Sequence, residues 1–175
     1  MIPSLADRIS SMQRALHNVI IPAIAPDNGL AMEQAHLMLA HLGLIAEQAD
    51  YTEPYEAAEL VALERLATAL AQAAGGGART IAAAASLRAE LESGDAADAG
   101  RRRARTVALS SLVEGLLDAS GIDGDESFQA VSHDLIIAEN RLSSTRDRAW
   151  FRSTGFETGD VSLPSLATML TPAQP

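Results

Sequence analysis

The sequence contains no cysteine, no lysine and few aromatic residues. Without cysteine, the protein cannot form disulfides, use a thiolate nucleophile or bind zinc through sulfur. All 13 basic residues are arginine. A GC-rich bacterial codon bias explains this most simply, and the rival interpretation is selection for the planar guanidinium at particular sites. Aromatics make up only 3% of the chain, so the core must consist of aliphatic side chains and alanine, which suit closely packed helices.

Positive charge is scarce as well, since 23 acidic residues against 13 arginines give a net charge of −10. Nucleic-acid binding depends on basic side chains that neutralise phosphates. The excess of acid therefore argues against a nucleic-acid partner and against an anionic membrane surface. The N-terminus lacks the basic and apolar segments of a signal peptide, and no run of 18 apolar residues predicts a membrane span. We therefore expect an acidic cytoplasmic protein.

The spacing of apolar residues predicts helices and no strand. The expected helices cover residues of about 5–21, 30–50, 54–74, 79–92, 103–119 and 127–151, and a tail follows over 152–175. A chain of 175 residues is long enough for a sizeable core. We expect a single all-α domain over 1–175, an up-and-down bundle of five to six helices with a short C-terminal arm.

Capping and breaking residues predict where some of these helices end. Ser4 can cap the first helix, with Asp7 in its first turn. Pro22 either kinks or ends that helix, because proline has no N–H to donate. Gly121 is expected to stop the helix over 103–119. The apolar piece over 161–170 is expected to form a short docking helix or arm.

The helix expected over 30–50 is apolar most of the way round, which is typical of a central helix. Its ionisable residues Glu33 and His36 lie on one face. Two Glu-x-x-His pairs with two further carboxylates make the di-metal site of ferritin-like bundles. This chain has one such pair, and the other half of the ligand set is missing in recognisable form. The simpler interpretation is an i, i+3 pair on a solvated stripe, so we expect no metal and no cofactor.

Three further ionisable residues, Glu59, Glu139 and Arg146, fall on the expected inward faces of two other helices. Glu139 and Arg146 lie two turns apart on one face, and the simpler interpretation is a buried ion pair or separate partners on neighbouring helices. The functional alternative is an arginine that awaits a carboxylate or phosphate ligand. The candidate ligand site comprises Glu33, His36, Glu59, Glu139 and Arg146.

Several other segments carry residues of ligand-binding motifs without the rest of the motif. Residues 123–127 have the acidic side chains of a calcium loop but lack its glycine at position six and its glutamate at position twelve. The glycines over 75–77 lack the lysine and the strand of a phosphate loop. The arginines over 101–105 follow an acidic linker, and we interpret them as local charge balance.

The segments 12–16 (Met-Gln-Arg-Ala-Leu), 19–24 (Val-Ile-Ile-Pro-Ala-Ile) and 33–37 (Glu-Gln-Ala-His-Leu) give residues 4–70 a family resemblance. This part, about 40% of the chain, resembles uncharacterised bacterial all-helical proteins, some of which are found beside acyl-CoA dehydrogenases and small-molecule kinases. The resemblance implies an accessory role. It assigns no catalytic residues.

The absence of any complete catalytic motif favours a protein that is not an enzyme. The leading hypothesis is a non-catalytic helical bundle that self-associates, as a homodimer, or serves as an accessory that binds a protein partner. Its apolar surface over 30–50 exceeds what one helix–helix contact needs. The alternative is a ligand- or metal-binding enzyme with a carboxylate and histidine site between the helices expected over 30–50, 54–74 and 127–151.

Overall fold

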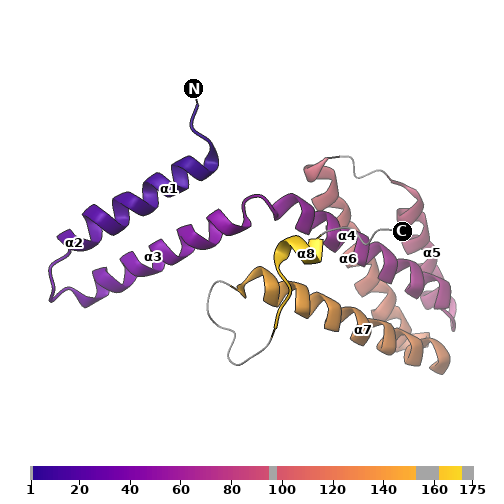
Figure 1. The fold of residues 1–175 in the computed structure, drawn as a ribbon. Helices are drawn as coiled ribbons and strands as arrows, with labels where there is room; N and C mark the ends of the chain where they lie inside the picture. Colours follow the sequence, from indigo (N-terminus) through magenta and orange to yellow (C-terminus); the bar gives the residue numbers. More distant parts are fainter. Residues whose placement is uncertain (1, 95–97, 153–161, 171–175) are drawn as a thin grey trace. The chain divides into compact units, whose positions relative to one another are not determined.

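The computed structural model describes residues 2–94, 98–152 and 162–170 (Figure 1). These residues form helices and connecting turns and contain no strand, so the expected all-α fold is confirmed for them. The chain divides into two compact units, one of Met1–Thr52 with Asp147–Pro175 and one of Glu53–Arg146. We describe each unit by itself, and the single domain expected from the sequence stays a prediction.

The first unit begins with a helical hairpin. α1 (Leu5–Ala15) starts at Ser4, whose hydroxyl accepts a hydrogen bond from the Asp7 N–H while the Asp7 carboxylate accepts one from the Ser4 N–H. This is the cap that the sequence predicts. After a turn, α3 (Gly29–Gln48) starts at Asn28, whose side-chain oxygen accepts from the Ala31 N–H. α1 and α3 lie side by side and antiparallel (Figure 1).

A widened turn carries the first helix past its proline. α1 continues into the π-helical segment η1 (Leu16–Ile20), where the Ile21 N–H bonds the Leu16 carbonyl five residues back. α2 (Ile21–Ala23) then ends because Ile24 is extended. A proline ring clashes with the preceding turn of an α-helix and leaves a carbonyl without a donor, and a π-bulge accommodates such a defect. Pro22 thus widens the helical turn that precedes it, and the helix ends one residue later, at Ala23.

The second unit holds the main core, which four helices share. They are α4 (Thr52–Ala73), α5 (Ala78–Glu92), α6 (Ala99–Asp123) and α7 (Glu126–Trp150). The buried side chains that pack together come from all four helices: Leu60, Ala67, Leu70, Ala71, Ala84, Leu87, Leu109, Val113, Leu116 and Phe128. Alanine and leucine predominate, as expected from the lack of aromatics, and small side chains allow the helices to approach closely.

α6 is longer than the sequence analysis predicts, and the expected stop at Gly121 is wrong. The helix begins at Ala99, because the Asp98 carboxylate accepts from the Arg101 N–H, and it runs through Gly121 to Asp123. A glycine ends a helix when it adopts the left-handed conformation, and Gly121 does not adopt it. The helix ends instead at Gly124, whose backbone is extended.

The turns that follow α4 and α6 are locked to each other. Gly76 pairs with Gly124, and the Gly77 N–H donates to the Asp123 carbonyl at 2.7 Å. The Asp123 carboxylate accepts from the Thr80 hydroxyl at 2.6 Å and from the backbone N–H groups of Arg79 and Thr80, at the first turn of α5. These bonds, the Thr80 hydroxyl first, lower the pKa of Asp123. The acidic turn that lacks a calcium motif therefore caps a helix.

A short helix, α8 (Leu166–Leu170), closes the described part of the chain. Leu163 and Leu166 are buried, so this piece does dock as the sequence suggests. Residue 161, the first of the expected arm, lies outside the described residues.

Candidate functional site

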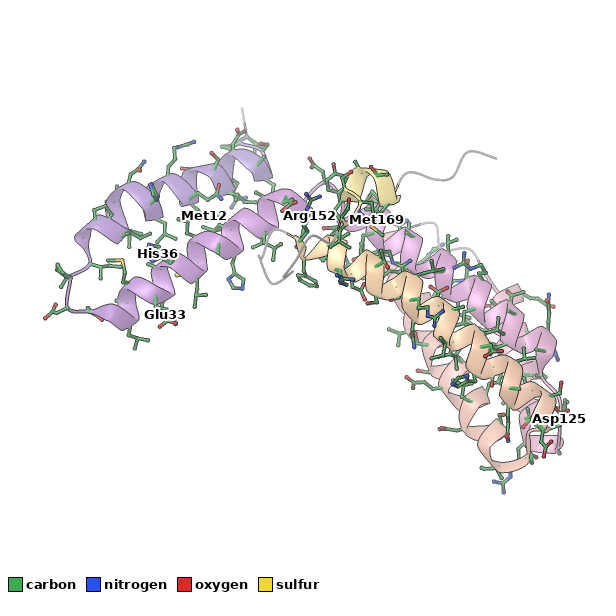
Figure 2. The ribbon with its side chains drawn as sticks, turned by 60° about the horizontal axis from the view of Figure 1, so that its bottom comes forward. Met12, Glu33, His36, Asp125, Arg152 and Met169 are labelled. Carbon is green, nitrogen blue, oxygen red and sulfur yellow. The ribbon has the colours of Figure 1, made fainter. Side chains whose placement is uncertain are left out.

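Glu33 and His36 lie on α3, near the turn that closes the hairpin (Figure 2). Both side chains are exposed. They line one shallow hollow of about 520 Å³, together with Pro26, Gly29, Met32 and Leu37. The predicted common face of the two residues is therefore correct. The hollow is open to solvent and does not enclose either side chain.

Glu139 lies on α7 in the second unit and has its partner on a neighbouring helix. Its Oε2 accepts from Arg65 Nη2 of α4 at 2.8 Å. The other carboxylate oxygen, Oε1, is buried without a hydrogen-bond partner, and so is Nε of Arg146. Glu139 thus has a partner on a neighbouring helix, as one of the simpler interpretations predicts. Glu59 is half-buried on α4.

The structure brings the five candidate residues together only in part. Glu33 and His36 belong to the first unit, and Glu59, Glu139 and Arg146 belong to the second. Within residues 2–94, 98–152 and 162–170, no three His, Asp or Glu side chains are placed to hold a metal ion. In the described chain, Glu33 and His36 therefore have no third ligand beside them, and the joint site stays a prediction.

The arginines over 101–103 do balance nearby acids. Arg101 pairs with Asp98, Arg102 with Glu53 and Arg103 with Glu56. The last pair raises the pKa of Arg103, through its hydrogen bond and charge interaction with Glu56. Exposed pairs of this kind contribute little to stability individually. The pairs of Arg102 and Arg103 connect the N-terminal parts of α4 and α6 and leave Glu56 paired with an arginine.

Arg105, the last arginine of this cluster, does more than the local charge balance that the sequence analysis assigned to it. It is buried on α6, where Nε donates to Glu64 Oε1 of α4 at 2.7 Å. Its Nη1 and Nη2 donate to the carbonyls of Glu90 and Leu91 at the end of α5, at 3.0 and 3.1 Å. One guanidinium therefore joins three helices. Arg105 lies one turn before Leu109 on the apolar stripe of α6, and this position could have indicated from the sequence that Arg105 is buried.

The hairpin also carries an apolar groove along its length. It runs between α1 with η1 and α3, and encloses about 410 Å³. We call it the hairpin groove; its eight lining residues are Met12, Ala15, Leu16, Ile20, Met38, His41, Leu42 and Ile45. His41 is its one ionisable residue, and His41 Nδ1 is hydrogen-bonded to the Leu37 carbonyl at 2.8 Å.

The walls of the hairpin groove are exposed although they are apolar. The exposed fractions are 49% for Met12, 50% for Ile20, 60% for Met38 and 48% for Ile45. α3 was expected to be a central helix, yet Ala35 is its one buried residue. The burial expected of a central helix is thus not found in the described residues, and hydropathy alone does not predict which molecule covers an apolar helix.

A second, more polar cleft of about 410 Å³ lies in the same unit. Glu47, Tyr51, Arg152 and Ser165 line it, with Ala149, Leu166 and Ala167. The Gln48 side chain donates to the Trp150 carbonyl at 2.9 Å beside it and ties α3 to α7. Glu47 and Arg152 give this cleft one charge of each sign, and Arg152 is labelled in Figure 2.

No helix in the described part of the chain combines the length and the apolarity that crossing a membrane requires. No family model, no curated protein and no solved structure matches the chain.

Proposed function

We propose that this protein is a non-catalytic cytoplasmic homodimer, in which the hairpin groove is the contact between the two copies. The observation that carries the proposal is the groove itself, with four large apolar side chains about half-exposed along its walls. Exposed apolar side chains that gather in one groove, and are not scattered singly, are typical of interaction sites. The accessory role implied by the family resemblance agrees with a protein that binds proteins.

The hairpin has too small a core of its own. Among residues 2–52, the buried side chains are Ile9, Leu16 and Ala35. Two helices that share so few buried residues gain little free energy to offset the conformational entropy lost on folding. A second hairpin laid over the groove would complete a four-helix bundle, in which each helix buries a full apolar stripe. Self-association would thus supply the packing that the isolated hairpin lacks.

The test introduces charge into the groove. In a variant with Met38→Glu and Ile45→Glu, the proposal requires association at least about a hundredfold weaker, because a buried carboxylate without a partner is strongly unfavourable. Sedimentation velocity over a concentration series would measure the shift. Ala40→Glu is the matched control: Ala40 is exposed on the same helix and lies about 200° around it from Met38.

The control variant should associate as the wild type does. If both glutamate variants associate equally well, the groove is not the contact. Circular dichroism at 222 nm would show that each variant retains its helices.

A ligand site is the second candidate function, and the buried, partnerless atoms Glu139 Oε1 and Arg146 Nε favour it. Buried polar groups normally have hydrogen-bond partners, so a small carboxylate or phosphate at Arg146 would fit. Metal analysis of protein purified without chelator, and thermal melts with phosphate or short dicarboxylates, would test it. A melting temperature that rises in the wild type and not in Arg146→Met would favour this function over the first.

A further inference from the structure

The register of the hairpin fixes which residues lie at the centre of the groove. A Cβ on Gly43 would lie 3.7 Å from the Gln13 side chain, so residues 13 and 43 are at the same level. In two antiparallel helices, residue numbers rise along one helix as they fall along the other, so the residue numbers of any two residues at the same level add up to the same sum. Ala15 therefore lies level with His41, and both line the groove midway between its ends at Met12 and Ile20.

Formal charge is almost absent from this part of a strongly acidic chain. Between Ala15 and Ala46, the Asp, Glu and Arg residues are just Asp27 and Glu33. Glu33 lines the hollow with His36 and not the groove. Two copies that carry −10 each could approach along this face without close repulsion between carboxylates. A basic partner would instead select an acidic surface, so a second copy suits the groove better.

Charge also decides between the two ways in which two hairpins can stack. If both loops were at one end, the two Asp27 residues would meet there and the two Arg8 residues would meet at the other end. With the loops at opposite ends, each Arg8 lies toward the loop of the partner that carries Asp27. The C-terminal ends of the two α3 helices then lie at opposite ends of the bundle.

From this placement we infer that two copies pack groove to groove as an antiparallel, isologous four-helix bundle. Its twofold axis passes at the level of Ala15 and His41. Each of these residues faces its own counterpart in the other copy, because a residue on a twofold axis meets itself. The inference rests on the proposed self-association and adds its geometry.

The size of the face agrees with this occupant. A helix of 20 residues is about 30 Å long, and two helices side by side are about 20 Å wide. The face therefore covers on the order of 600 Å², compared with about 800 Å² for each partner of a standard interface. A single helix in the groove would cover about half of that face.

Because the chain has no cysteine, single cysteines can map the contact without background. The variants are Ala15→Cys, His41→Cys and the control Ala40→Cys, all at exposed positions. Each purified variant is treated with a short bismaleimide, and covalent dimer is measured on a denaturing gel. We expect Ala15→Cys and His41→Cys to be cross-linked at least about tenfold faster than Ala40→Cys.

Other outcomes separate the inference from the proposed function. If the wild type sediments as a monomer, both fail. If it is a dimer in which neither variant alone is cross-linked, while a mixture of Ala15→Cys and His41→Cys is, the loops lie at the same end. The antiparallel arrangement is then overturned and self-association remains. Equal cross-linking of all three variants would overturn the groove contact, and circular dichroism confirms that each variant is folded.

Discussion

Single residues carry the connections between the elements of this protein. Asp123 binds the first turn of α5 from the end of α6, and Arg105 binds the last turn of α5 from the start of α6. Gly76 has a φ of 122°, in the region that favours glycine. Sequence reasoning did not find these roles, because the partners of Asp123 lie 43 and 44 residues away. A cap formed at such a distance has no local pattern.

Gly76→Ala should destabilise the protein, since both the φ angle and the space exclude a side chain. An added Cβ would lie 2.6 Å from the Asp125 nitrogen and 2.7 Å from the Gly124 Cα. We expect a loss of about 2 kcal/mol in the free energy of unfolding. Gly115→Ala should instead gain about 0.5–1 kcal/mol, because Gly115 lies within α6 and has nothing within 4 Å of the added atom. Urea denaturation measures the free energy of unfolding of both variants. Equal changes in the two variants would contradict the close pairing of the turns that follow α4 and α6.

Asp123 should make stability depend on pH in the acid range. Because its pKa is lowered in the folded state, its contribution is fully present above the usual value of 3.8 and is lost as the pH falls through the folded-state pKa. Asp123→Asn should therefore melt lower than the wild type at pH 7, and the difference should shrink toward pH 2. Asp118→Asn, at an exposed position of the same helix, is the control for removing one negative charge from α6. A difference in melting temperature that stays constant with pH would contradict the assignment.

At the scale of elements, the sequence predicts helix positions well and helix ends unevenly. Ser4 caps the first helix as predicted, and the helix expected over 30–50 is found at Gly29–Gln48. The predicted helix over 103–119 falls four residues short at each end, since Gly121 is tolerated inside a helix whose end is set by Asp123. The hydropathy of α3 indicates how much cover it needs. Glu33 and His36 share the predicted face, and convergence with Glu59 and Glu139 would depend on the placement of two separate units.

The junction of α4, α5 and α6 should depend on Arg105. Arg105→Met would leave the Glu64 carboxylate and two α5 carbonyls without their donor. We expect a loss of about 3 kcal/mol in the free energy of unfolding, measured in urea. Arg105→Met combined with Glu64→Gln should recover part of that loss, because the partly buried charge is then removed. No recovery in the double variant would mean that the two side chains do not interact.

At the scale of the whole molecule, a compact bundle and an apolar hairpin coexist in an acidic chain. The two tendencies oppose each other, since net charge keeps copies apart while the groove favours contact. Salt should therefore strengthen association: screening reduces the repulsion between copies that carry −10 each and leaves the apolar contact in place. We expect the dissociation constant of the wild type to decrease when the NaCl concentration is raised from about 0.05 to 0.5 M. A constant that rises with salt would indicate a contact held by ion pairs.

The most direct test of self-association through the hairpin is the molar mass of the wild-type protein in solution. Sedimentation equilibrium over a hundredfold range of concentration, at moderate salt, would measure it. We predict a mass that approaches twice the 18.3 kDa of the chain as the concentration rises, and that stays near the single-chain mass in the Met38→Glu, Ile45→Glu variant. A wild-type mass that remains at 18.3 kDa over the whole range would contradict the account.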